Sequence, residues 1–320
     1  MITKSVSTFK TSVRIIFYFK LVIIIRQTVF TGSACAIVTP FDSEGKVDYR
    51  MLKNQVDYQI NNGTDAIVVC GTTGENSVLN TREQRQVIKS VVKYAEKRVP
   101  VIAGTGSNST ENAVKRSYAA ESVGADALLI VTPYYNKCSQ AGLIEHYEFI
   151  SNRTDLPIII YNVPTRTGVD IKPETYKELC KIKNIVATKE ANSNLSALMK
   201  TIRLCGDELD IYCGNDDQTA AFTAMGAKGV ISVLANIIPR DVHQLCSYAL
   251  SGDFKKCVAL QTKLLDLANV LFCDVNPIPV KYAMKLLGLD SGVYRLPLND
   301  TSEANKMHIR DCLRQYRLIN

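Results

Sequence analysis

Eight short apolar segments constrain the fold of this chain more than any other feature of its sequence. Each is rich in β-branched residues and apolar on both faces, as expected of a strand buried between a barrel interior and a helix layer. Longer, helix-like stretches separate them. The segments are ACAIVT (34–39), DAIVVC (65–70), VPVIAG (99–104), DALLIV (126–131), PIIIYN (157–162), NIVATK (184–189), LDIYCG (209–214) and KGVISV (228–233).

This alternation predicts an α/β protein, a (β/α)8 TIM barrel, because eight strands and seven intervening helices fit a closed parallel barrel. A doubly wound sheet is the alternative, but the first strand is not followed by the fingerprint GxGxxG. Residues 239–320 contain more helical sequence than closing the barrel requires, so we expect a C-terminal helical appendage. The expected divisions are residues 1–28 outside the fold, 29–238 as the barrel and 239–320 as the helical region.

The net charge of the chain, formally +7, is concentrated at its beginning. Five of the 38 basic residues lie in residues 1–28, which hold no acid, so the remaining 33 face 31 acidic residues. A nearly neutral body without a basic stripe argues against a nucleic-acid partner.

The beginning of the chain also carries an apolar run, IIFYFKLVIII (15–25). It is interrupted by Lys20 and shorter than the ~20 residues that a membrane-spanning helix needs, so we expect no membrane partner. The ten cysteines form no CxxC pair and no zinc-finger spacing, which indicates reduced thiols and a cytoplasmic protein. Our hypothesis is that translation of the working protein starts at Val29, which the N-terminal mass of the native protein would test.

Lys189 carries the most chemical information, because it ends an apolar strand where a TIM barrel has its active site. Burial disfavours the charged form of a lysine, and the neutral amine is a nucleophile that can form a Schiff base. Strand alternation directs the neighbouring Glu190 to the opposite face of the sheet, so its carboxylate is not placed to pair with Lys189. From these residues alone, a lysine that pairs with another carboxylate or reaches solvent remains an open alternative. A histidine-based mechanism or metal site is not expected, since all three histidines fall in helix-like stretches (His146, His243 and His308).

The other strand ends supply glycines, hydroxyls and one arginine. Residues 71–75 (GTTGE) lack the Gly-Lys-Ser/Thr ending of a phosphate loop, but their amides and hydroxyls can converge on one small anion. Tyr161 can move protons beside a Schiff-base lysine, and Arg166 can hold a carboxylate with a bidentate fork. A plain turn, a rim aromatic and a surface arginine are the simpler alternatives.

Together these segments resemble the dihydrodipicolinate synthase family of pyruvate-dependent class I aldolases, within the N-acetylneuraminate lyase superfamily. The resemblance runs from about Phe30 to the C-terminus and rests on several motifs in the same order. They are GSACAIVTPF (32–41), GTTGENSVLN (71–80), VIAGTGSN (101–108), ADALLIVTPYYNKCSQ (125–140), YNVPTRTG (161–168), TKE (188–190), GNDD (214–217) and KGVISV (228–233).

The resemblance implies a reaction centred on Lys189. This residue would attack pyruvate, lose water and form an enamine that adds to L-aspartate 4-semialdehyde, and the product would cyclise to 4-hydroxy-tetrahydrodipicolinate. This is an early step of lysine and diaminopimelate synthesis. Thr72 and Thr73 would hold the pyruvate carboxylate. Tyr161, Thr73 and Tyr135 would form a proton relay, with Tyr135 supplied by the adjacent subunit.

The resemblance also implies the remaining parts of the site. Arg166 would grip the carboxylate of the aldehyde substrate, and Gly214 and Ile231 would line the pocket through backbone groups. No metal or organic cofactor is expected, and the assembly would be a homotetramer, a dimer of tight dimers. Arg166 and the pair Tyr134–Tyr135 favour the synthase. The alternatives are a 2-keto-3-deoxy sugar acid aldolase or N-acetylneuraminate lyase and, in another class, a non-catalytic barrel that binds a small acid.

One departure from the family concerns its interface pocket, where lysine-inhibited members place histidine and glutamate. Losing a carboxylate removes a partner for the ammonium group of the inhibitor. The resemblance therefore predicts weak or absent feedback inhibition by L-lysine. The corresponding positions read Asn76, Ser77, Thr81, Gln84 and Asn112, with Asn108 and Tyr134 retained.

Overall fold

The structure is a computed structural model that describes residues 28–320. The hypotheses about residues 1–28 therefore lie, apart from Thr28, outside the described residues.

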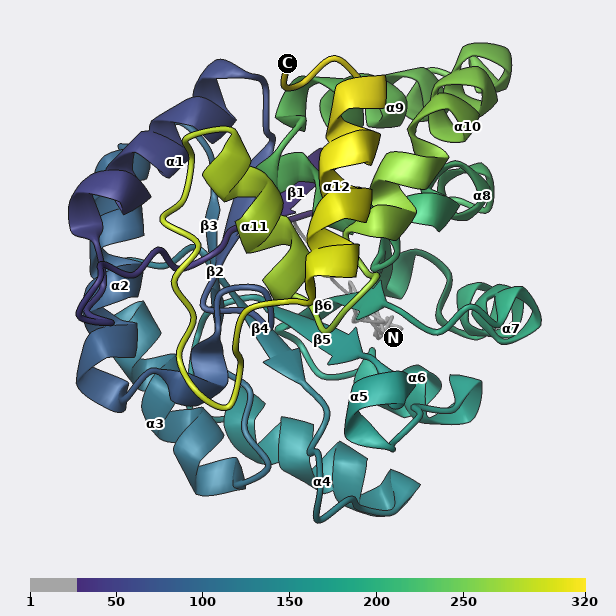
Figure 1. Ribbon diagram of the computed structural model, residues 1–320. Coiled ribbons are helices and arrows are strands. Elements are labelled where there is room, and N and C mark those ends of the chain that lie inside the picture. The colour runs from purple at the N-terminus through teal and green to yellow at the C-terminus, as the bar shows by residue number, and fades with distance from the viewer. Residues whose placement is uncertain (1–27) are drawn as a thin grey trace, which may run out of the picture.

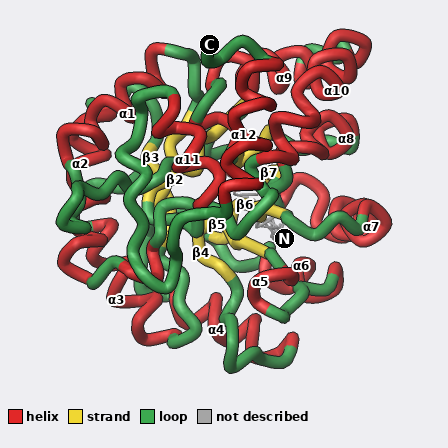
Figure 2. The backbone as a smooth tube through the Cα atoms, in the orientation of Figure 1, coloured by secondary structure: helices red, strands yellow, loops and turns green. Residues whose placement is uncertain are grey.

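Eight parallel strands form a closed barrel in chain order, and the last strand pairs with the first. Figure 2 shows these strands at the centre of the molecule with the helices around them. The predicted (β/α)8 barrel is confirmed. The strands are β1 (Gly32–Ala36), β2 (Ala66–Val69), β3 (Val101–Gly104), β4 (Ala127–Val131), β5 (Ile158–Asn162), β6 (Ile185–Glu190), β7 (Asp210–Cys213) and β8 (Gly229–Ser232).

The helices begin and end at residues whose chemistry suits those positions. Asn80 and Glu83 form a capping box at the start of α2, and proline occupies the first turn of α6, α9 and α11. Gly63 and Gly124, just beyond α1 and α3, adopt the positive φ that ends a helix at little steric cost. The helices are α1 (Tyr49–Asn61), α2 (Thr81–Ala95), α3 (Thr110–Glu121), α4 (Gln140–Ser151), α5 (Pro164–Thr167), α6 (Pro173–Leu179), α7 (Leu195–Cys205), α8 (Thr219–Ala224), α9 (Pro239–Leu250), α10 (Phe254–Val270), α11 (Ile278–Leu286) and α12 (Glu303–Gln315), with short 3₁₀ turns at η1 (Asn76–Val78), η2 (Gly206–Glu208), η3 (Asp216–Gln218) and η4 (Leu234–Asn236).

The buried apolar side chains form two layers, as strands that are apolar on both faces require. An inner cluster fills the barrel, and a larger outer cluster lies between strands and helices. Phe30 stacks on Tyr212 in the inner cluster, with ring centroids 4.2 Å apart, and the Tyr212 hydroxyl donates to the Phe30 carbonyl at 2.7 Å. Residues just before β1 are thus part of the barrel packing.

The C-terminal helices complete and then extend the barrel. α9 packs against β1 and β8 in the ring of helices, and α12 packs against α10 and α11. In Figure 1, α11 and α12 (yellow-green and yellow) lie in front of the strands. This arrangement confirms the expected helical appendage. None of the helices within residues 28–320 combines the length and apolar character that crossing a membrane requires.

Candidate active site

A cavity of about 220 Å³ lies at the carboxyl ends of the strands, where the fold places active sites. A second cavity of about 190 Å³ adjoins it, since both are lined by Gly71, Thr72, Leu129, Tyr161, Val163 and Arg166. The predicted residues Thr73, Lys189 and Gly214 also line the first cavity. The histidines, which lie on α4, α9 and α12, line neither.

Lys189 lies in β6 with its side chain directed into the barrel mouth, and the residue is only 5% exposed. The Lys189 Nζ is 4.5 Å from the centroid of the Tyr161 ring, because β5 and β6 place these two residues side by side in register. Within residues 28–320, this nitrogen makes no ion pair and no hydrogen bond. The structure therefore brings Lys189 and Tyr161 together and gives the amine no polar partner among residues 28–320.

The turn at residues 71–75 forms the opposite wall of the cavity. Thr73 is buried, and its hydroxyl oxygen accepts a hydrogen bond from Asn276 Nδ2 at 3.0 Å. The Gly74 carbonyl accepts a hydrogen bond from Thr39 Oγ1 at 2.7 Å. A Cβ on Gly74 would lie 3.1 Å from the Cys70 backbone nitrogen, so the tight turn favours glycine here. Thr72 and Thr73 thus line the cavity on a turn that hydrogen bonds from Thr39 and Asn276 hold in place.

Arg166 and Gly214 line the first cavity, whereas Ile231 lines neither cavity. Arg166 is exposed on α5 at the cavity entrance, and its guanidinium donates to the Asn276 carbonyl at 3.4 Å. A Cβ on Gly214 would lie 2.9 Å from the Glu190 carbonyl, so glycine permits this close approach of β7 to β6. Ile231 is buried within the inner cluster of the barrel.

Tyr135 is not part of the cavity formed by its own chain. Its side chain is 91% exposed and its backbone adopts a left-handed conformation, with φ of +72°. The left-handed backbone belongs to a three-residue turn, which the Asn136 N–H closes by donating to the Tyr134 carbonyl at 2.9 Å.

The predicted interface-pocket residues divide into two groups. Asn76, Ser77 and Tyr134 line the second cavity. Gln84 is buried beside them, where its amide nitrogen donates to the side-chain oxygen of Asn76 and, at 3.1 Å, to the Gly104 carbonyl. The remaining positions lie outside the cavity, with two exposed side chains and one half-buried side chain (Thr81, Asn112 and Asn108).

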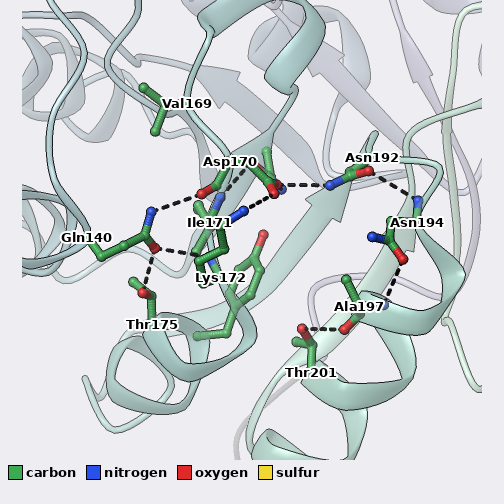
Figure 3. A network of polar contacts seen from close by, with 12 residues as sticks. Gln140, Val169, Asp170, Ile171, Lys172, Thr175, Asn192, Asn194, Ala197 and Thr201 are labelled. Carbon is green, nitrogen blue, oxygen red and sulfur yellow. Dashed lines mark hydrogen bonds and ion pairs between the residues drawn. The ribbon is translucent and has the colours of Figure 1, made fainter.

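A network of hydrogen bonds lies behind β5 and β6, on the side away from the cavity. Asn162 Nδ2 donates to both oxygens of Glu190, at 3.0 and 3.1 Å, and to Asp170 Oδ1 at 3.0 Å. Asn192 Nδ2 also donates to Asp170, at 2.9 Å. Figure 3 shows how the network continues from Asp170 to Gln140 on one side and through Asn192 toward α7 on the other. The strand ends that carry Tyr161 and Lys189 are therefore tied together from behind.

The two carboxyl groups of this network have different electrostatic surroundings. Burial raises the pKa of Glu190 to about 7, although hydrogen bonds from Asn162, Asn192 and Tyr176 act against it. Burial also works to raise the pKa of Asp170, but hydrogen bonds from three side chains outweigh it, and the pKa is lowered. As predicted, strand alternation separates Glu190 from Lys189.

Asn276 is a residue of the site that the sequence reasoning missed. It precedes α11, lines the cavity and contacts both Thr73 and Arg166. Its side-chain oxygen has no hydrogen-bond partner within the described part of the chain. The signal that could have drawn attention to it is the segment NPIP (276–279), which interrupts an otherwise helical region.

Possible metal ligands are scattered over the described part of the chain. Within residues 28–320, no three His, Cys, Asp or Glu side chains are grouped so that they could hold one. His146, which is buried, instead shares a hydrogen bond of 2.9 Å with Thr110.

Comparison with known proteins gives one consistent result. Residues 29–316 match the model of the dihydrodipicolinate synthetase family. The 4-hydroxy-tetrahydrodipicolinate synthase of Geobacter metallireducens is 50% identical over 290 residues, which cover 91% of this chain and 100% of the relative. The corresponding synthase of Clostridium novyi is 47% identical over 290 residues, with coverage of 91% and 98%.

Solved structures agree with these matches. The crystal structure of dihydrodipicolinate synthase from Aquifex aeolicus superposes with a TM-score of 0.89 at 45% identity and covers 90% of this chain and 99% of that one. The chloride-inhibited enzyme from Acinetobacter baumannii, solved with pyruvate, gives 0.89 at 43% identity, with coverage of 91% and 100%.

Proposed function

Because the chain belongs to the dihydrodipicolinate synthetase family, we propose that Lys189 is the amine through which it performs the reaction of that family. The protein is an enzyme, a lyase of the class I aldolase type with 4-hydroxy-tetrahydrodipicolinate synthase activity. The family uses pyruvate and L-aspartate 4-semialdehyde as substrates. The observation that carries the proposal is the position of Lys189 Nζ, buried at the barrel mouth beside Tyr161 and without a polar partner among the described residues.

In the proposed reaction, Lys189 Nζ attacks the keto carbon of pyruvate, and loss of water leaves an iminium. Loss of a proton from the methyl group gives an enamine, whose carbon attacks the aldehyde of the second substrate. The amino group of that substrate then displaces Lys189 and closes the ring. Tyr161, whose ring lies 4.5 Å from the lysine nitrogen, is placed to move protons during addition and dehydration.

The turn at residues 71–75 is proposed to bind the pyruvate carboxylate through Thr72 and Thr73. Because Asn276 donates to the Thr73 oxygen, the hydroxyl proton of Thr73 remains available for donation. This supports a role for Thr73 in the proton relay as well as in binding. The Asn276 side-chain oxygen, which has no hydrogen-bond partner among residues 28–320, offers an acceptor on the same wall of the cavity.

Arg166 is proposed to hold the carboxylate of L-aspartate 4-semialdehyde. Its exposed guanidinium lies at the entrance and can still present a two-pronged donor, since its one hydrogen bond to residues 28–320 is long, at 3.4 Å. Gly214 is proposed to line the pocket through its backbone. Ile231 is proposed to act only as part of the packed barrel interior beneath the site.

Tyr135 is proposed to complete the proton relay of a neighbouring subunit in a homotetramer built from tight dimers. Its 91% exposure supports this role, because the side chain lines neither cavity of its own chain. A cytoplasmic location belongs to the same proposal.

Feedback inhibition by L-lysine is predicted to be weak or absent. Gln84 and Asn76 bond to each other in the interface pocket, and neither supplies a carboxylate for the ammonium group of lysine. Initial rates of the purified enzyme measured against L-lysine would test this. Strong inhibition below millimolar L-lysine would show that other groups of the pocket replace the missing carboxylate.

The function is tested by comparing turnover of aldehyde acceptors with pyruvate as the donor. The proposal expects efficient condensation with L-aspartate 4-semialdehyde and poor turnover of the aldehydes of sugar acids. The reverse preference would identify a sugar-acid aldolase or an N-acetylneuraminate lyase. Absence of turnover with every acceptor would favour a barrel that binds a small acid without catalysis.

A further inference from the structure

The wall of the cavity formed by residues 71–75 is joined to the C-terminal helices by two contacts. Asn276, just before α11, donates to Thr73, and Lys281, within α11, pairs with Glu75. The partners of these contacts lie 203 and 206 residues apart in the chain. The C-terminal segment therefore contacts both the substrate-facing middle and the end of the turn.

Lys281 and Glu75 form an ion pair that is fully inside the protein. The Lys281 Nζ and Glu75 Oε1 are 2.7 Å apart, and both side chains have an exposed fraction of 0%. The ammonium group also donates to the Thr39 carbonyl at 3.0 Å and to the Val293 carbonyl at 2.6 Å. These three acceptors use all three N–H groups of the lysine.

The second oxygen of Glu75 is also occupied, since it accepts a hydrogen bond from the Arg295 backbone nitrogen at 3.3 Å. Glu75 has a left-handed backbone with φ of +53°, a conformation that a glutamate adopts only when its surroundings hold it there. Lys281 and Arg295 supply those surroundings. The side-chain contacts of Glu75 thus fix the backbone two residues beyond Thr73.

We propose that Lys281 is a positioning residue of the pyruvate site. Its pair with Glu75 holds residues 71–75 so that Thr72 and Thr73 face Lys189 across the cavity. This inference rests on the proposed function, because it assumes that the turn binds the pyruvate carboxylate. Lys281 itself lines neither of the two cavities.

Two properties separate this role from ordinary stabilisation of the fold. The contacts of Glu75 and Thr73 lie on one short turn, so a shift of the turn changes the carboxylate site before it changes Lys189 or Tyr161. Removing one partner of a buried pair leaves an uncompensated charge, whereas replacing both partners by neutral groups does not. Replacing both partners is therefore expected to restore stability but not the contact that positions the turn, so the KM for pyruvate separates positioning from stabilisation.

The test compares four proteins: the wild type, Lys281→Met, Glu75→Gln and the double variant Lys281→Met/Glu75→Gln. Lys285→Met is the matched control, because Lys285 is an exposed lysine one turn further along α11. Steady-state kinetics give kcat and the KM for pyruvate at saturating aldehyde. Thermal unfolding of each variant shows whether it is folded at the assay temperature.

Lys281→Met is expected to raise the KM for pyruvate by about tenfold or more, with a smaller change in kcat. The double variant, which also lacks the ion pair, is expected to keep a raised KM although its stability recovers, and Lys285→Met to behave as the wild type. A folded Lys281→Met variant with an unchanged KM would overturn the inference. Should Lys281→Met fail to fold, Glu75→Gln and the double variant decide, and an unchanged KM in both would overturn it equally.

Trapping of pyruvate by borohydride in the wild type keeps this inference separate from the function on which it rests. If the wild type traps no pyruvate on Lys189, the proposed function fails and the inference fails with it. If the wild type traps pyruvate and the Lys281 and Glu75 variants have a normal KM, only the inference fails.

Discussion

Among the described residues two lysines are buried, and their surroundings are opposite. Lys281, in α11, has three acceptors, one of them the carboxylate of Glu75. Lys189, in β6, makes no hydrogen bond or ion pair with residues 28–320 and faces the ring of Tyr161. A buried lysine with a complete set of acceptors suits a structural role, whereas a buried amine without acceptors among these residues is available to attack a carbonyl carbon. The two lysines therefore predict opposite consequences of the same substitution.

The largest expected effect follows from replacing the lysine that has no partner. Lys189→Met should lower kcat/KM by roughly 10⁴-fold or more, because it removes the nucleophile. It should not lower the free energy of unfolding, since no ion pair is lost. Kinetics and urea unfolding on one preparation measure both quantities. A Lys189→Met variant that loses stability as well as activity would show that Lys189 also stabilises the fold, which contradicts the contrast with Lys281.

The second-largest effect is on the free energy of unfolding and follows from replacing Lys281. Lys281→Met should lower the free energy of unfolding by about 3–5 kcal/mol, because Glu75 is left buried and unpaired. Adding Glu75→Gln should restore much of the loss, while Lys285→Met should change little. Urea denaturation of the variants provides the values. Equal destabilisation by the single and double changes would mean that packing, rather than charge, accounts for the effect.

Tyr161 sharpens the comparison, because it is the contact that Lys189 has in place of an ionic partner. Tyr161→Phe retains the ring but removes the hydroxyl, and should lower kcat by about 10²- to 10⁴-fold if that group transfers protons. The amount of pyruvate trapped by borohydride after long incubation should stay the same, because Lys189 remains. A variant with normal kcat would remove Tyr161 from the relay.

The smallest effect is on the pH dependence of stability, and it comes from the buried carboxyl group of Glu190. Its pKa is raised from the ordinary carboxyl value to about 7, so the folded state favours the protonated form. Stability from this group is complete below the ordinary pKa and is lost as pH rises through 7. The glutamine in Glu190→Gln cannot ionise, so this variant does not lose that stability as pH rises.

The advantage of Glu190→Gln over the wild type in free energy of unfolding should therefore grow between pH 5 and pH 8, by about 1–3 kcal/mol. Urea unfolding at the two pH values gives the difference. A difference that does not change with pH would show that Glu190 keeps one protonation state over this range.

These predictions draw on two kinds of sequence information. The eight strands could be predicted because each is a local apolar run, and Lys189 and Tyr161 because the fold places strand ends at one face. The same alternation predicted that Glu190 would face away from Lys189. In each case the signal lies within a few residues of the feature it predicts.

The remaining parts of the site depend on contacts that no local pattern records. Asn276 and Lys281 belong to a segment that the sequence identified only as a helical appendage, and their partners lie more than 200 residues earlier. A lysine in a helical sequence is usually exposed, as Lys285 is, so nothing nearby distinguished Lys281. Its burial became evident only when α11 was seen against the turn at residues 71–75.

Reductive trapping is the measurement that tests the central claim, that the buried amine of Lys189 binds pyruvate covalently. The enzyme is incubated with pyruvate and borohydride, digested and analysed by mass spectrometry, with Lys189→Met as the control. The account predicts one reduced pyruvyl group on the peptide that carries Lys189 and none in the control. A modification on another lysine, or an unmodified Lys189 peptide in active enzyme, would contradict it.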